Sequence, residues 1–313
     1  MNSFAAHNTP GAPSTPGRWR RELSLVVLSP EGPGTLSDLT RVLARATGAE
    51  GAVLWEVHNE PDSAAPISVV ARWLAGPVAL GPHRTATPDA VTDRAFRLRS
   101  LALPGDLPGE PPTLFGCPVA AAVPVDCPDG LAGVVSLLGA KELSDHAFDV
   151  AAELVEVLPA LCGILREHQT LALVHACNTV LHDADVESPD QPLRAERLRE
   201  HLEHICRQVA KTLECAEVAI FLQRAPTAEY RYPLFASSGP SGPGDPAGSG
   251  REPDPPTAGT TPRPRVDGSL LELPLRSGND VWGLLRCTRA TGLPLHFTIS
   301  DLPVLRPVTT AVA

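Results

Sequence analysis

The spacing of hydrophobic residues changes along the chain from helical to strand-like and back again. The first helical stretch covers 36–48, and its apolar face carries Leu36, Leu39, Val42, Leu43 and Ala46. Apolar runs at 51–57 and 67–74 predict strands, and a shorter helical stretch follows at 89–98. Two more apolar runs, at 117–125 and 130–139, predict a pair of strands joined by a polar turn.

A long helix is predicted from Ser144 to about Asp185, where apolar residues recur with helical spacing. Pro159 lies inside this pattern, and because proline lacks the backbone donor we expect it to kink or break the helix. The apolar stripe is longer than one sheet can cover. We therefore expect this helix to connect two domains.

The second half of the chain repeats the same order of elements. Apolar patterns predict one helix and then four strands, at 193–213, 218–223, 230–236, 269–275 and 280–288. Before the last two strands, fourteen of the 27 residues from Gly239 to Arg265 are proline or glycine. Because such a composition cannot bury a core, we predict a disordered insert at 239–265.

Two alignments without gaps indicate that the halves are copies of one unit. The strand pairs match at an offset of 150, which aligns Pro124 with Pro274 and Gly133 with Gly283. Upstream, the helix and strand at 36–57 match 202–223 at an offset of 166. A chance resemblance between two hairpins would not also repeat the helix and strand that precede them. The sequence therefore predicts a duplicated domain whose second copy has lost part of its middle.

Composition and charge exclude several classes of function. The chain has 313 residues and a net charge of −10, and it lacks the basic stripe with which nucleic-acid binders neutralise phosphates. It has no apolar run of membrane-spanning length and no apolar signal segment near its start. We therefore expect a cytoplasmic protein with neither membrane nor nucleic acid as a partner. The many Ala, Pro, Arg and Gly residues and few Lys are typical of a GC-rich genome, and we expect a bacterial source.

Motifs for catalysis and metal binding are missing. The sequence contains no GxSxG, P-loop, GxGxxG or HExxH motif. Its seven cysteines include no CxxC pair, which argues against a zinc ribbon and a redox dithiol and fits a reducing compartment. We predict a non-enzymatic protein without catalytic residues or metal ligands, and no cofactor is indicated.

The whole pattern resembles the GAF domain family. The resemblance lies in the helix that leads into GAVLWEV, in VPV…GLAGVVSLLG, and in the helix start LSDHAFDVAAELVEVL. It implies an α+β fold with two GAF-like domains, each an antiparallel sheet flanked by helices, joined by a long helix. In this family a pocket lies on one face of the sheet and is closed by the variable middle segment. The resemblance therefore implies small-molecule sensing or a dimerising regulatory module, without identifying a ligand.

These features divide the chain into four parts. We expect a disordered arm at 1–20, a first GAF-like domain at 22–165, and a helical linker and loop at 166–192. A degenerate second domain, which includes the insert, is expected at 193–313.

Two groups of residues are candidates for function. The pocket of the first copy would draw on its large apolar residues, one histidine and one thiol: Trp55, Trp73, His83, Phe96, Phe115 and Cys117. The alternative for each is an ordinary core or loop position. The long helix would pair with a second chain or pack between the domains through Leu154, Leu161, Ile164 and Leu171.

Three functional hypotheses follow. The first is a tandem GAF regulatory protein that binds a small molecule, or that forms a homodimer and relays a signal to a partner protein. The second is a structural scaffold for protein–protein interaction with filled pockets. The third is a thiol-based reductase that uses Cys117 and Cys127. A cavity in the first copy would favour the first hypothesis, and a filled interior the second.

Overall fold

The computed structural model describes most of both halves of the chain. Described residues are 18–28, 34–57, 67–76, 88–126, 132–140, 142–184, 191–222, 234–238, 264–277, 280–290 and 295–311. Helix α1 (Arg18–Leu28) includes the last three residues of the predicted arm, and β8 (Arg265–Asp267) begins at the last residue of the predicted insert. The remainder of the arm, residues 239–263 of the insert, His83 and Cys127 lie outside the described residues.

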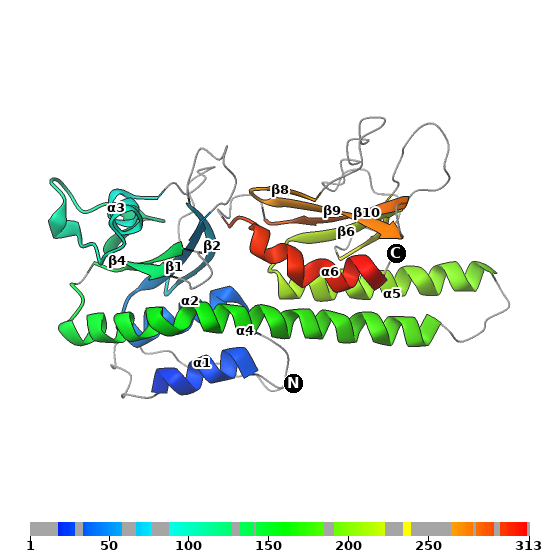
Figure 1. Ribbon diagram of the computed structural model, residues 1–313, viewed down its shortest axis with the longest axis horizontal. Coiled ribbons are helices and arrows are strands. Elements are labelled where there is room, and N and C mark those ends of the chain that lie inside the picture. The colour runs from blue at the N-terminus through cyan, green and yellow to red at the C-terminus, as the bar shows by residue number, and fades with distance from the viewer. Residues whose placement is uncertain are drawn as a thin grey trace.

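The first domain is a five-stranded antiparallel sheet with helices on both faces (Figure 1). Its order is β2-β1-β5-β4-β3, from the strands β1 (Gly51–Val57), β2 (Ile67–Leu74), β3 (Thr113–Leu114), β4 (Cys117–Asp126) and β5 (Ala132–Leu138). One face packs against α1, α2 (Leu36–Thr47) and the first half of α4 (Asp145–Ala184). The other face packs against α3 (Ala90–Leu98), and a short 3-10 turn, η1 (Pro104–Asp106), follows.

Local sequence explains where α2 begins and ends. Thr35 caps its start, because the Thr35 hydroxyl accepts from the Asp38 amide while the Asp38 carboxylate accepts from the Thr35 amide. Gly48 ends the helix in the left-handed conformation, at φ 69°. Between α3 and β3, one isolated bridge pairs Ala102 with Ala122 on β4.

The second domain repeats the architecture with fewer described helices. Its sheet has the strand order β7-β6-β10-β9-β8. Besides β8, its strands are β6 (Glu217–Leu222), β7 (Leu234–Ser237), β9 (Leu270–Ser277) and β10 (Asp280–Thr288). One face packs against α5 (Gln191–Thr212), α6 (Leu302–Ala311) and the second half of α4, and η2 (Ile299–Asp301) leads into α6. On the opposite face Ala219 and Phe221 form a small cluster with Leu284, and no helix of the described part covers it.

The two sheets agree in register as well as in strand order. Gly133 lies opposite Glu56 on β1, and its counterpart Gly283 lies opposite Leu222 on β6, as the two offsets require. A β-bulge also recurs, between Leu54 and Trp55 and between Ile220 and Phe221. The predicted α+β fold, with two antiparallel sheets of one topology flanked by helices and joined by a long helix, is confirmed.

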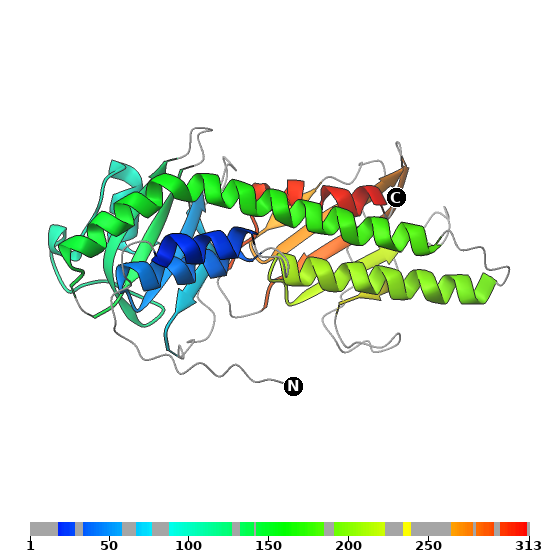
Figure 2. The ribbon, with the colours of Figure 1, turned by 90° about the horizontal axis from the view of Figure 1, so that it is seen from below.

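Helix α4 runs along both domains (Figure 2). It is one continuous helix through Pro159, so of the two effects expected of this proline, a kink or a break, the break was wrong. Pro159 is held between buried neighbours on α4, since Leu158 and Cys162 both pack in the first core. That packing compensates for the backbone hydrogen bond that proline cannot make.

The glycine shared by both strand pairs is explained by close backbone approach. A Cβ atom at Gly133 would lie 2.5 Å from the carbonyl oxygen of Trp55, and one at Gly283 would lie 2.5 Å from that of Phe221. No side chain fits at such a distance. The close approach of the neighbouring strand's carbonyl oxygen therefore requires glycine at this position in both domains.

We expect Gly133→Ala to lower the free energy of unfolding by about 1–3 kcal/mol, the usual cost of overpacking. Gly105→Ala is the matched control, because Gly105 is exposed in η1 and an added Cβ meets nothing within 4 Å. That control should leave stability unchanged or raise it by up to about 1 kcal/mol. Urea unfolding of both variants checks this, and equal effects would contradict the explanation.

Candidate functional site

The residues expected to bind a ligand do not all lie together. Trp55, Phe96, Phe115 and Cys117 belong to one hydrophobic cluster on the α3 face of the first sheet. Trp73 packs on the opposite face, where the Arg45 guanidinium lies 5.7 Å from the centroid of its ring. The structure therefore brings four of the six candidates to one face.

The floor of this α3 face is filled by side chains. Trp55 is fully buried, and its indole nitrogen donates to the Ser136 hydroxyl at 2.9 Å. The Ser136 hydroxyl lies 2.7 Å from that of Thr92 on α3, which is also buried and bonded to the N-cap residue Asp89. Because each buried polar group has a partner, this part of the face is a satisfied core.

The rim of the face carries a cation and a thiol. The Arg72 guanidinium lies 4.9 Å from the centroid of the Phe115 ring, and its Nη1 atom is buried without a hydrogen-bond partner in the described part of the chain. Burial lowers the pKa of Arg72. Burial and the nearby Glu50 carboxylate raise the pKa of the Cys117 thiol, which disfavours the reactive thiolate.

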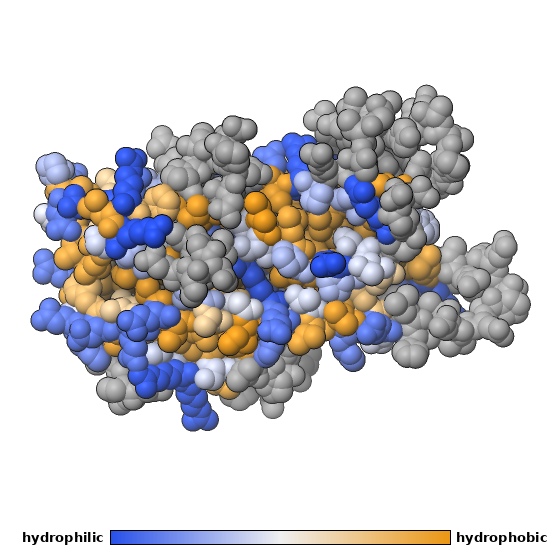
Figure 3. Space-filling view, in the orientation of Figure 1, coloured by the Kyte–Doolittle hydropathy of each residue, from blue (hydrophilic) through white to orange (hydrophobic). Residues whose placement is uncertain are grey.

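The candidate residues on α4 divide between its two sides. Leu154 is buried in the first core and Leu161 packs partly against it, so neither belongs to an exposed stripe. Ile164 and Leu171 are 41% and 58% exposed. Val157, which sequence reasoning missed, is 41% exposed and continues their seven-residue spacing. Figure 3 shows apolar side chains in patches along the band that α4 occupies.

Gln169 lies where α4 passes from one domain to the other. Its side chain is buried, and its amide nitrogen donates to the carbonyl oxygen of Gly34 at 3.1 Å and to that of Thr212 at 3.2 Å. Gly34 precedes α2 of the first domain, and Thr212 ends α5 of the second. One side chain on the shared helix thus bonds the backbone of both domains.

A second contact between the domains is ionic. Arg166 on α4 donates to Glu56 at the end of β1 at 2.6 Å, and both side chains are largely buried. The other oxygen of Glu56 accepts from the Thr298 hydroxyl, just before α6, at 3.0 Å. Glu56 therefore joins its own sheet to the shared helix and to the second domain.

The segment Leu295–Thr298, which we call the strap, runs between the two sheets. The His296 amide donates to the carbonyl oxygen of Val69 on β2 at 2.8 Å, and the Phe297 amide donates to that of Gly268 beside β9 at 2.7 Å. Leu295 is buried in the α3-face cluster of the first domain, whereas Phe297 is buried in the second core. Successive parts of the strap are thus anchored in different domains.

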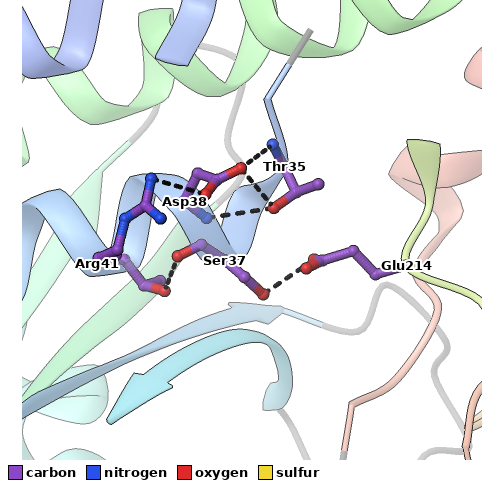
Figure 4. Close-up of polar contacts among 6 residues, drawn as sticks. Thr35, Ser37, Asp38, Arg41 and Glu214 are labelled. Atoms are coloured by element: carbon purple, nitrogen blue, oxygen red, sulfur yellow. Dashed lines mark hydrogen bonds and ion pairs between the residues drawn. The ribbon is translucent and has the colours of Figure 1, made fainter. Parts of the chain in front are cut away.

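A fourth contact joins α2 to the turn between α5 and β6. The Ser37 hydroxyl donates to the Glu214 carboxylate at 2.9 Å (Figure 4). Glu214 has φ 53°, and the 166-residue offset aligns it with Gly48, at φ 69°. A non-glycine residue is strained in that region. The second domain thus has Glu214 where the first domain has Gly48, which adopts this conformation without strain. The Glu214 carboxylate contacts Ser37 of the first domain.

These four contacts form the candidate functional site, which we call the interdomain joint. Asp301 lies fully buried beside it and accepts from the Thr298 amide at 2.9 Å. No group of three or more metal-ligating side chains occurs among the described residues. Among the described helices, none combines the length and the hydrophobicity that a membrane span requires. The described side chains of the joint are held by hydrogen bonds and one ion pair that connect the two domains.

Comparison with known proteins gives distant structural matches. No protein-family model and no curated protein sequence matches the chain. The chain is similar to the GAF domain of a phosphoenolpyruvate-protein phosphotransferase from Acinetobacter, with 12% identity and a TM-score of 0.32 over 47% of this chain and 93% of that one.

Two phytochrome structures are also similar. A bacteriophytochrome from R. palustris matches with 11% identity and a TM-score of 0.34 over 88% of this chain and 63% of that one. The photosensory core module of a Stigmatella aurantiaca phytochrome matches with 16% identity and a TM-score of 0.33 over 65% of this chain and 46% of that one. The chain thus spans less than two thirds of either phytochrome structure. At this similarity the likeness extends to no ligand or activity.

The pKa of the Asp301 carboxyl is raised, because burial outweighs the favourable charges of Arg166 and Arg289. The folded protein therefore holds this proton more tightly than the unfolded chain does. Ionised Asp301 destabilises the fold above its folded pKa, and this penalty disappears as the pH falls toward the unfolded value.

We therefore expect Asp301→Asn to melt at a higher temperature than the parent near neutral pH. The gap should shrink on acidification, because the parent's carboxyl then becomes neutral. Melting temperatures measured across a pH series check this. A variant that melts at a lower temperature than the parent at neutral pH would contradict this prediction. It would mean that the two arginines stabilise the charged carboxylate by more than burial destabilises it.

Proposed function

We propose that the chain is a non-catalytic regulatory module in which helix α4 couples two GAF-like domains. The observation that carries this proposal is the membership of α4 in both cores. Leu158 and Leu165 are buried in the first core, and Leu173 and Cys177 in the second. Displacing α4 would therefore disturb the packing of both domains together.

Two features indicate that the coupling is specific. Gln169 and Arg166 place buried polar groups at the point where α4 changes domains, and such groups are costly to leave without partners. The strap adds a second route, since it links the first sheet directly to α6. A signal received by one domain would reach the other through these contacts and pass to a partner protein.

The module works as a homodimer along the exposed side of α4. Val157, Ile164 and Leu171 recur every seven residues, which is the repeat that lets two helices pack along a seam. Between them lie the small residues Ala160 and Gly163, both exposed. Small and apolar side chains in this order allow a second copy of α4 to approach closely.

Small-molecule sensing by the first domain is a second candidate. It is favoured by Arg72, whose buried Nη1 atom has no partner in the described part of the chain and would suit an anionic group. It is opposed by the filled floor beneath, where Trp55 occupies the face. The thiol reductase is less favoured, because the raised pKa of Cys117 disfavours a nucleophilic thiolate.

The double variant Ile164→Asp, Leu171→Asp tests the dimer. Light scattering should give the parent twice the chain mass of 33.0 kDa and the variant a single chain mass. Burying unpaired carboxylates at a seam costs several kcal/mol, so the dissociation constant should rise by more than about a hundredfold.

Leu98→Asp, Leu101→Asp is the matched control, because these side chains are also exposed, at 57% and 44%, but lie away from α4. It should remain dimeric. Circular dichroism would verify that all variants fold. A monomeric parent, or a dimer that survives both changes on α4, would refute this part of the proposal.

A further inference from the structure

The exposed seven-residue series on α4 ends in a polar residue. After Val157, Ile164 and Leu171, the next position of the series is Asn178. Asn178 is exposed like the other three side chains. Before Val157 the series reaches Val150, which is buried in the first core. The exposed series, which we call the first row, therefore runs from Val157 to Asn178, and Asn178 is its one polar member.

A second row lies beside the first, three residues further along in each heptad. Its members are Ala160, Glu167 and Val174, of which the first two are exposed and Val174 is half-buried. The two rows occupy the a and d positions of a heptad, which is the pattern of a two-stranded coiled coil. Together they form a seam that extends over about 30 Å of helix.

Helix α1 lies next to this seam without covering it. His168 directly follows a member of the second row, and its Nδ1 atom lies 2.7 Å from the Val27 carbonyl oxygen on α1. With α1 in this place, Ile164 and Leu171 remain 41% and 58% exposed. A second helix can therefore reach the seam while α1 stays packed.

The polar member of the first row distinguishes the ways in which two copies can pair. In a parallel, in-register pair, first-row residues face their own counterparts, so the Asn178 amides of both copies can bond to each other. In an antiparallel pair along the same row, Val157 of each copy faces Asn178 of the other. Both amides then lose water without gaining a partner. Ile164 and Leu171 pack with apolar residues in either arrangement, so Asn178 decides between them.

Glu167 is the one charged residue of the two rows, and it opposes the parallel arrangement. A parallel pair places the two Glu167 carboxylates at the same level of the seam, where they repel each other. The antiparallel pair instead places Glu167 opposite His168 of the other copy. Because Glu167 is exposed, water and salt screen its carboxylate, whereas an amide shut against valine has no such relief. The amide therefore outweighs the carboxylate.

We propose that two copies of the chain pair in parallel and in register along α4, with Asn178 as the residue that fixes the register. This inference rests on the proposed dimer and goes beyond it, because the apolar residues alone allow either orientation. Parallel pairing places the two first domains side by side and the two second domains side by side. A shift of α4 in one copy would then act on the same two domains of the other.

Cysteine cross-linking of the full chain tests the orientation. An antiparallel pair brings a residue opposite its own copy near one point only, whereas a parallel pair does so along the whole first row. Val157→Cys and Leu171→Cys lie about 20 Å apart along the helix. Each should therefore give a covalent dimer on mild oxidation, seen on a non-reducing gel and removed by dithiothreitol.

The matched control is Thr179→Cys, because Thr179 is exposed on α4 next to Asn178 but lies outside both rows. It should give several-fold less covalent dimer than Leu171→Cys. The parent chain, which carries the native cysteines, sets the background. A control that links as well as Leu171→Cys would overturn the assignment of the seam.

Light scattering of the parent separates this inference from the dimer itself. A dimeric parent whose Val157→Cys and Leu171→Cys variants do not link to themselves would overturn the parallel arrangement and leave the dimer standing. Linking of Ile164→Cys to Leu171→Cys in a mixture of the two would identify the antiparallel pair. A monomeric parent would overturn both the dimer and this inference.

The role of Asn178 is tested by Asn178→Leu. The dimer should become about tenfold tighter, because leucine adds apolar contact at the seam. In the Leu171→Cys background, the self-linked fraction should fall several-fold, because the register is no longer fixed. A looser dimer, or an unchanged self-linked fraction, would overturn the assignment of the register to Asn178.

Glu167→Gln gives a second measure of orientation that needs no cross-link. In the parallel pair this change removes a repulsion between like charges, so the dissociation constant should fall several-fold, and the gain should shrink at high salt. A looser dimer would mean that Glu167 faces a cation, as in the antiparallel pair, and would overturn the proposal.

Discussion

Helix α4 has to bury apolar side chains in two different cores, and the rest of the structure depends on that constraint. Leu165 belongs to the first core and Leu173 to the second, and the buried Gln169 lies between them. The Gln169 amide is shared by a backbone carbonyl of each domain. Because buried amides and carbonyls are costly to leave unpaired, the position of α4 is fixed with respect to both sheets.

The two domains divide their roles around this helix. The first has a filled sheet face, with Trp55 held by Ser136. The second contributes the strap and Glu214, and both reach into the first domain. Glu214 has a left-handed backbone conformation and stands where the first copy has Gly48. The second copy is therefore strained at the turn through which it contacts the first domain. On this account, divergence between the copies built the interdomain joint.

Sequence patterns predicted the repeat well because its signals are local. A glycine required by a close carbonyl oxygen, as at Gly133, and a capping box, as at Thr35, can each be recognised from a few neighbouring residues. The joint leaves no such mark, because Glu56, Arg166 and Thr298 are distant in sequence and of types common on any surface. Periodicity on α4 also does not separate Leu154, which is buried in the first core, from the exposed Ile164, since apolar residues occupy both the core side and the exposed side of this helix.

Native-state hydrogen exchange tests the coupling through α4 most directly. Leu305→Ala removes a fully buried side chain of α6 from the second core, and a change of this kind costs about 2–5 kcal/mol. If α4 couples the domains, amide protection should fall in β1 and β5 of the first domain as well as in β6 and β10. Protection that falls in the second sheet alone would show that the domains open independently and would contradict the account.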